Sequence, residues 1–144
     1  MAKGFTVTAT IDRSADEVWQ FICDFQHAHR WMPGISGMRP ADDGPMSQGK
    51  RFYFQFRGRE RATQISTWQP PRRFALTSTQ GGVTATYVYE VADQGNATKV
   101  QLDAACEARG LWKVIHPLIV HLMRKADGGQ LENVKAVLEG QDGE

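Results

Sequence analysis

The sequence predicts an α+β fold in which a curved antiparallel sheet of about six to seven strands packs against one long C-terminal helix. Alternation of apolar and polar residues, which is typical of strands, occurs at 5–11 and recurs between 35 and 108. Helical periodicity is strongest at 14–25 and 111–138. Such separation of strands from helices along a chain is typical of α+β proteins with helices on one face of a sheet.

The first strand and the first helix are predicted by adjoining patterns. In residues 5–11, apolar side chains alternate with threonines, as in a half-buried strand. Ser14 and Glu17 then match a capping box, in which each side chain satisfies a backbone N–H of the other residue. A helix should therefore begin here, with Val18, Ile22 and Phe25 on its apolar face.

A short second helix is expected within residues 25–35, where bulky rings precede a turn at Pro33 and Gly34. The segment has two interpretations. It is either a hinge or lid over a cavity, or a plug that places Trp31 and Met32 in the core. The sequence leaves both open.

The remaining strands are expected to form a meander. Turn and loop residues at 40–49, Gly58, Pro70-Pro71, Gly81-Gly82 and 94–96 divide it into strands at 35–39, 50–56, 61–69, 73–79, 83–91 and 98–108. A twisted sheet of this size curls. Its concave, aromatic face has one candidate partner, the C-terminal helix.

That helix is expected to run from Leu111 to Leu138 and to be curved or jointed. Its apolar residues form two stripes, within 111–126 and 131–138, that lie about a third of a turn apart around the axis. The change of phase falls at Gly128-Gly129, and a glycine costs about 1 kcal/mol in a helix interior relative to alanine. Pro117 favours a bend as well. The alternative is two helices joined by a Gly-Gly loop.

Composition and charge exclude several classes of protein. The 144 residues are expected to form a single domain, 1–144, and a net charge of +1 argues against nucleic-acid binding, including sequence-specific binding. Cys23 and Cys106 lie in apolar-periodic segments, so we expect no disulfide scaffold. The first residues lack the pattern of a signal peptide, and charged residues and histidines interrupt 111–138. We therefore expect a cytoplasmic protein without a transmembrane segment.

Four segments carry a resemblance to a known family. The order of elements resembles the START-like helix-grip superfamily (SRPBCC), nearest its polyketide cyclase/dehydrase and lipid-transport branch. The similar segments are TATIDRSADEVWQFICDF, Trp31-Met32-Pro33, DQGNATKVQL and LENVKAVLE. The resemblance covers almost the whole chain and implies a single helix-grip domain with a deep cavity, between sheet and long helix, that holds an apolar molecule.

The candidate ligand-binding residues are those that this arrangement would place on the cavity wall or at its mouth. They are Trp31, Met32, Phe54, Tyr87, Tyr89, Trp112, Ile115, Ile119 and Leu122. Ordinary core packing is the alternative for each of them, because aromatic residues in strand alternation are usually core.

No metal or cofactor is expected. His116 and His121 would point about 140° apart around a helix, and His27 and His29 are two residues apart. Neither pair is accompanied by an HExxH motif or a cysteine pair.

Three functions are compatible with the sequence. The first is a binding or carrier protein for a hydrophobic small molecule such as a lipid, an isoprenoid or a polyketide. The second is a cyclase or dehydratase in which Tyr87, Tyr89 or His116 polarises a carbonyl. The third is an interaction module, in which the arginine-rich hairpin 57–61 contacts a protein partner or a membrane surface. Association of two copies of the chain as a homodimer is a further possibility that we consider.

Overall fold

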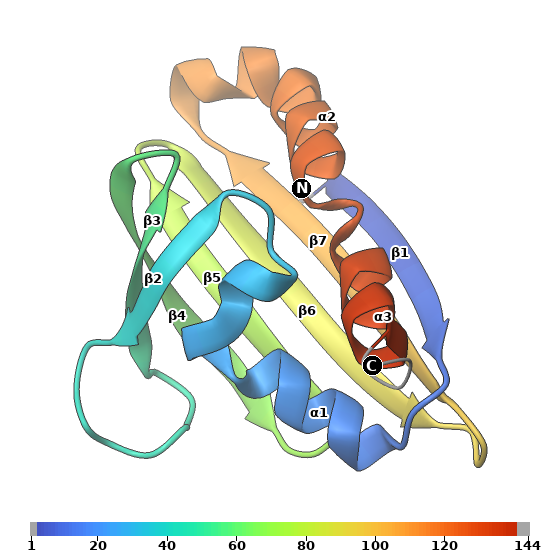
Figure 1. Ribbon diagram of the computed structural model, residues 1–144. Coiled ribbons are helices and arrows are strands. Elements are labelled where there is room, and N and C mark those ends of the chain that lie inside the picture. Colours follow the sequence, from blue (N-terminus) through green and yellow to red (C-terminus); the bar gives the residue numbers. More distant parts are fainter. Residues whose placement is uncertain (1–2, 141–144) are drawn as a thin grey trace.

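The structure of the chain, a computed structural model, describes residues 3–140, and Figure 1 shows its layers. One antiparallel sheet carries all of the helices on a single face. The α+β prediction is therefore confirmed. The ends of the predicted domain, 1–2 and 141–144, lie outside the described residues.

The sheet has seven strands in the order β1-β7-β6-β5-β4-β3-β2. Strands β2 to β7 follow one another as a meander, and β1 closes the order by pairing with β7 from Lys3↔Cys106 to Ile11↔Thr98. The strands are β1 (Lys3–Ile11), β2 (Ile35–Pro40), β3 (Arg51–Phe56), β4 (Arg59–Gln69), β5 (Arg73–Gln80), β6 (Val83–Asp93) and β7 (Thr98–Ala108). The strand positions match the alternation in the sequence closely.

Two short helices follow β1, as predicted. Helix α1 (Ala15–Cys23) is capped by Ser14, whose Oγ accepts the Glu17 backbone N–H at 3.2 Å. The six-residue 3₁₀ helix η1 (Phe25–Arg30) then leads to Trp31, which is only 1% exposed and meets the Tyr89 ring edge-on at 5.6 Å. Of the two interpretations of this segment, the core plug describes Trp31 correctly.

The C-terminal segment consists of the 3₁₀ helix η2 (Gly110–Ile115), helix α2 (His116–Asp127) and helix α3 (Gln130–Gly140). The predicted joint is confirmed at Gly128-Gly129, where Gly128 keeps right-handed angles of φ −63° and ψ −19°. Helical structure begins beside Leu111 as expected, but as the 3₁₀ helix η2, and the α-helix begins only at His116. The expected bend within the helix at Pro117 is wrong. Pro117 lies in the first turn of α2, where its missing N–H has no helical partner to lose, so it begins the helix instead of bending it.

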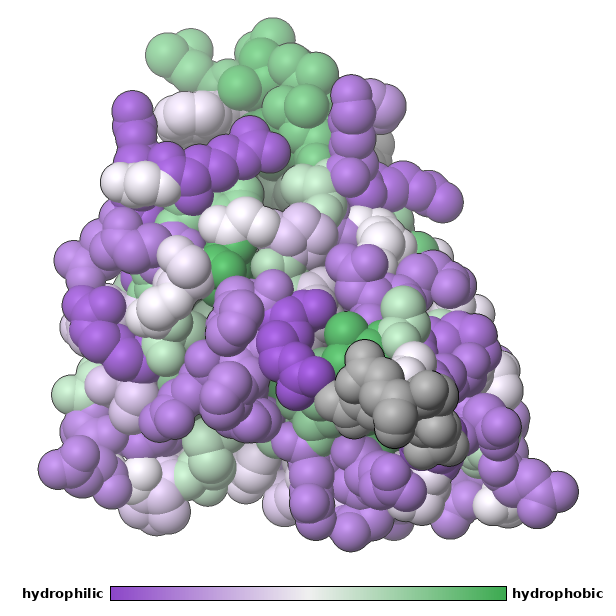
Figure 2. Space-filling model, viewed as in Figure 1, coloured by the Kyte–Doolittle hydropathy of each residue, from purple (hydrophilic) through white to green (hydrophobic). Residues whose placement is uncertain are grey.

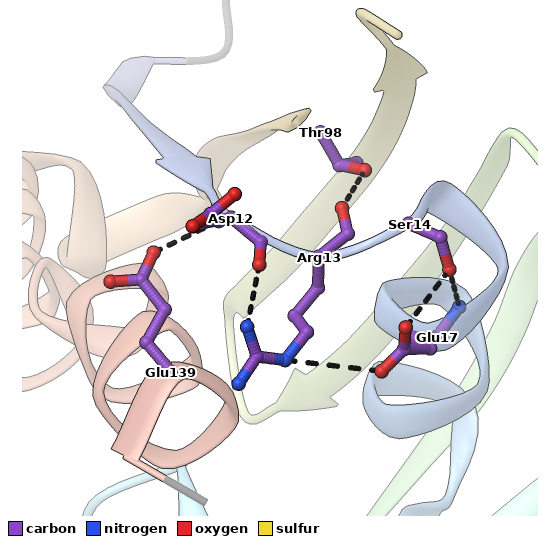
Figure 3. A network of polar contacts seen from close by, with 6 residues as sticks. All are labelled: Asp12, Arg13, Ser14, Glu17, Thr98 and Glu139. Atoms are coloured by element: carbon purple, nitrogen blue, oxygen red, sulfur yellow. Dashed lines mark hydrogen bonds and ion pairs between the residues drawn. The ribbon is translucent and has the colours of Figure 1, made fainter. Parts of the chain in front are cut away.

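Helix α3 is the part of the C-terminal segment whose side chains are buried. Leu131, Val134 and Leu138 are buried against the sheet, and α3 contacts both β1 and β7. Its last turn is held by polar contacts shown in Figure 3, where the Asp12 backbone N–H donates to Glu139 Oε2 at 2.9 Å. In the same corner Thr98 Oγ1 donates to the Arg13 carbonyl at 2.7 Å, which ties β7 to the chain that enters α1.

None of the helices within residues 3–140 is both long and apolar enough to cross a membrane.

Candidate functional site

A cavity of about 410 Å³ lies between the inner face of the sheet and the junction of α2 and α3. This volume falls in the usual range for small-molecule sites. Apolar side chains cover most of its wall, including Met32, Ile35, Met38, Phe54, Phe56 and Leu76. The wall also contains hydroxyl groups from Thr63, Ser78 and Thr79, and Glu60 and Arg61 of β4 contribute charge.

Four polar residues of the wall form a connected cluster, which we call the tyrosine–aspartate cluster. Tyr87 donates its hydroxyl hydrogen to Asp127 Oδ2, and Tyr89 donates to Gln130 Oε1 at 2.6 Å. Gln130 Nε2 donates to Asp127 Oδ1 at 3.1 Å. The cluster therefore joins β6 to both helices of the C-terminal segment.

Local geometry brings these residues together. Tyr87 and Tyr89 are two apart on β6, so strand alternation sends both to the same face of the sheet. Asp127 ends α2 and Gln130 begins α3, and their spacing of three residues keeps them on one side of the chain across the glycine joint. The glycine joint thus places the polar side chains of Asp127 and Gln130 in a cavity wall that is otherwise mainly apolar.

Burial controls the protonation of the cluster. It raises the pKa of the Asp127 carboxyl, while hydrogen bonds from Tyr87 and Gln130 and the nearby Arg57 guanidinium oppose the rise. Burial, reinforced by Asp127, raises the pKa of the Tyr87 phenol, and burial also raises the pKa of Tyr89. Both phenols consequently keep their protons at neutral pH and act as hydrogen-bond donors within the cluster.

The remaining hydrogen-bonding capacity follows from these assignments. Each phenol hydrogen is already used inside the cluster, but each phenol oxygen keeps a lone pair that can accept another hydrogen bond. Gln130 also has a second amide hydrogen. The cluster is therefore suited to receive a hydrogen bond from a hydroxyl group that enters the cavity.

Some of the predicted lining residues do line this cavity. Met32, Phe54, Tyr87 and Tyr89 belong to its wall. Trp31 does not, because it lies in the core against Tyr89.

The predicted residues of the C-terminal segment lie outside the cavity wall. Trp112, Ile115 and Leu122 are 45%, 40% and 53% exposed, and Ile119 is half-buried elsewhere on α2. The reason is that α2 contacts β7 and β1, whereas the cavity is formed over β2 to β6. Only its last residue, Asp127, reaches the wall.

The histidines and cysteines have other surroundings. His116, a predicted acid–base candidate, has Nε2 at 2.7 Å from the Cys106 carbonyl oxygen and so links the start of α2 to β7. Cys23 and Cys106 are both free thiols, and burial raises the pKa of Cys23 to about 12. Within residues 3–140 no group of three or more histidine, cysteine, aspartate or glutamate side chains could hold a metal ion.

Asp127 and Gln130 are the polar residues of the cluster that sequence reasoning missed, and the apolar wall residues Ile35, Met38, Phe56 and Leu76 were not among the candidates either. Polar residues on a helix are usually assigned to solvent, and nothing in the helical period brings them to a cavity. The available signal was their position on either side of the glycine pair at which the apolar stripe changes phase.

Comparisons with solved structures agree with this fold. The chain is similar to the Zhui aromatase/cyclase from Streptomyces sp. R1128, with 12% identity, a TM-score of 0.78 and coverage of 96% of this chain and 94% of that chain. It is also similar to a START superfamily protein from Mycobacterium smegmatis, with 20% identity, a TM-score of 0.66 and coverage of 95% and 94%. Norcoclaurine synthase from Thalictrum flavum is 15% identical, with a TM-score of 0.72 and coverage of 96% and 94%. At these identities the likeness concerns the fold.

Comparison at the level of sequence identifies the family. No curated protein sequence matches the chain. The family model described as polyketide cyclase/dehydrase and lipid transport, in contrast, matches residues 3–139, which is nearly all of it. The chain therefore belongs to the polyketide cyclase/dehydrase and lipid transport family.

Proposed function

We propose that this protein binds a hydrophobic small molecule that carries a hydroxyl group. The observation that carries the proposal is the tyrosine–aspartate cluster within a mostly apolar cavity. The apolar wall favours the carbon skeleton of a lipid, isoprenoid or polyketide-like ligand through removal of its surface from water. The free acceptor positions on the two phenol oxygens favour a ligand hydroxyl as the polar contact.

The family description supports this class of ligand, since it includes lipid transport as well as cyclisation and dehydration. Among the structural neighbours, one is named as an aromatase/cyclase and another as a START superfamily protein. The family description names both catalysis and lipid transport, so the chemistry of this chain's own cavity has to decide between them.

A matched pair of probes tests the proposal. We expect 2-naphthol to bind more tightly than 2-methoxynaphthalene, which cannot donate a hydrogen bond, by about two- to tenfold, the usual net value of one hydrogen bond. Isothermal titration calorimetry measures both affinities. The double variant Tyr87→Phe/Tyr89→Phe should change this preference, because it removes two phenol acceptors and releases Asp127 Oδ2 and Gln130 Oε1 from their phenol donors. Tyr53→Phe, which changes a tyrosine outside the cavity wall, should leave the preference unchanged. A native protein that binds neither of the two probes would contradict the proposal.

A cyclase or dehydratase is the second candidate, and a specific observation favours it. A buried carboxyl with a raised pKa that is hydrogen-bonded to a phenol, as Asp127 is to Tyr87, is the kind of group that can exchange a proton with a bound ketone or alcohol. Asp127 and Tyr87 would be its catalytic residues, and the shape of the cavity would orient the chain to be cyclised.

The test of this candidate is turnover of a linear poly-β-ketone to an aromatic product, followed by absorbance. We expect Asp127→Asn to abolish turnover while 2-naphthol still binds. His116→Ala should leave turnover intact, because His116 contacts the Cys106 carbonyl and not the cavity. A native protein that binds 2-naphthol but yields no product would exclude the enzyme and retain the binding function.

A further inference from the structure

The outer side of η2 and α2 presents an apolar stripe to solvent. We define this outer stripe as Leu111, Val114, Ile115, Leu118 and Leu122. Leu111 is 90% exposed, and Leu118 and Leu122 are each 53% exposed, although large aliphatic side chains are usually buried. Figure 2 shows hydrophobic residues gathered at the end of the molecule where Figure 1 places η2 and α2.

The direction of the stripe is set by contacts on the opposite side of the segment. The Trp112 ring packs on the β5–β6 turn so closely that a Cβ added at Gly82 would lie 2.3 Å from Trp112 Cδ1. His116 holds the start of α2 to the Cys106 carbonyl, and Met123 packs against the core. The outer stripe consequently faces solvent while the segment stays attached to the sheet.

The charged residues within 109–126 are all basic. Residues 109–126 contain no aspartate or glutamate, and they include Arg109, Lys113, Arg124 and Lys125, all of them exposed. The whole chain has a net charge of only +1, so this segment concentrates positive charge. A second copy of the same surface would bring like charges together, which disfavours a homodimer through this face.

We propose that η2 and α2 dock in the plane of an anionic lipid bilayer. An exposed apolar stripe with a tryptophan beside it, on a segment whose own charged residues are all basic, is the pattern of a helix that lies in a membrane interface. The stripe enters the boundary of the acyl chains, and the basic side chains contact anionic headgroups. Because Trp112 packs on the turn that follows Gln80 of the cavity wall, the docked surface adjoins the cavity.

Vesicle flotation with the full chain tests this proposal. We expect the native protein to float with vesicles of phosphatidylcholine and phosphatidylserine, and to bind vesicles of phosphatidylcholine alone much more weakly. Leu118→Ser/Leu122→Ser removes part of the stripe, and Arg124→Glu/Lys125→Glu reverses the local charge. Each should weaken binding about tenfold or more, because the first removes apolar area that enters the bilayer and the second replaces attraction to anionic headgroups with repulsion.

The matched control is Arg72→Glu/Lys99→Glu, which makes the same change in net charge at exposed positions outside η2 and α2. It should retain most of the binding. Because all of the altered side chains are exposed, circular dichroism should show that every variant is folded.

Three outcomes would overturn the proposal. The first is a native protein that binds neither kind of vesicle, and the second is binding that survives Leu118→Ser/Leu122→Ser. The third is a loss of binding on Arg57→Glu/Arg59→Glu alone, which would place the contact on the β3–β4 hairpin. In the first case, a native protein that is a dimer and becomes a monomer on Leu118→Ser/Leu122→Ser would identify a second copy as the occupant. None of these outcomes affects the 2-naphthol test, because the proposal does not depend on the ligand in the cavity.

Discussion

Asp127 is the residue on which the chemistry of the cavity depends most. It accepts hydrogen bonds from Tyr87 and Gln130, and it ends α2 at the one place where that helix reaches the cavity. A buried carboxylate is costly unless such donors compensate it. The raised pKa of Asp127 shows that burial outweighs these donors.

This raised pKa predicts a pH dependence of stability with a definite sign. Between the ordinary carboxyl pKa of 3.8 and the higher folded value, the folded state holds the Asp127 proton more firmly than the unfolded state. The contribution of Asp127 to the free energy of unfolding is therefore largest at low pH and falls as the pH rises through this window. Urea unfolding at a series of pH values should show Asp127→Asn gaining stability relative to the native protein as the pH rises. Asp43→Asn, at an exposed loop position, is the control. A difference between Asp127→Asn and the native protein that does not change with pH would contradict the assignment.

At the scale of elements, the two C-terminal helices have different functions in the fold. Helix α3 buries Leu131, Val134 and Leu138, whereas α2 has no fully buried residue. Periodicity in the sequence showed that each half has an apolar stripe, and the phase change correctly located the joint. It could not show which edge of the apolar face of α2 is turned to the sheet, because Ile119 and Met123 extend that face beyond Ile115 and Leu122. The predicted lining by Ile115 and Leu122 differs from the structure for this reason.

Two leucine substitutions test this division. Leu131→Ala should lower the free energy of unfolding by about 2–5 kcal/mol, because it removes a buried side chain from the core. Leu118→Ala should change it by less than about 0.5 kcal/mol, because Leu118 faces solvent. Chemical denaturation of both variants and of the native protein measures these two changes in the free energy of unfolding. Equal losses for the two variants would show that α2 is as deeply packed as α3.

The joint itself can be tested with two adjacent glycines. A Cβ added at Gly128 would lie 2.5 Å from the Arg124 carbonyl oxygen, so Gly128→Ala must displace the joint that positions Asp127 and Gln130. Gly129 has nothing within 4 Å of an added Cβ, and Gly129→Ala should be neutral or slightly stabilising. Calorimetric affinity for 2-naphthol should fall only in Gly128→Ala. Equal affinity in both variants would contradict the importance of the joint.

At the scale of the whole molecule, the cavity is formed by segments that lie far apart in the sequence. Strands β2 to β6 form its wall, η1 leads to Met32 at one side, and the α2–α3 junction closes the other. The sequence predicted the strands, the two short helices and the strand residues Phe54, Tyr87 and Tyr89 of the wall, because alternation determines which side chains share a face. It could not predict Asp127 and Gln130, whose position depends on contacts between segments far apart in the chain.

The most direct test of the proposed function is a titration of the ¹⁵N-labelled protein with 2-naphthol, followed by NMR. The cavity and the tyrosine–aspartate cluster predict a saturable shift of the Gln130 side-chain amide, with smaller shifts at residues of the wall such as Met32 and Leu76. Shifts confined to the outer stripe at Leu118 and Leu122, or shifts that do not saturate, would contradict ligand binding in the cavity.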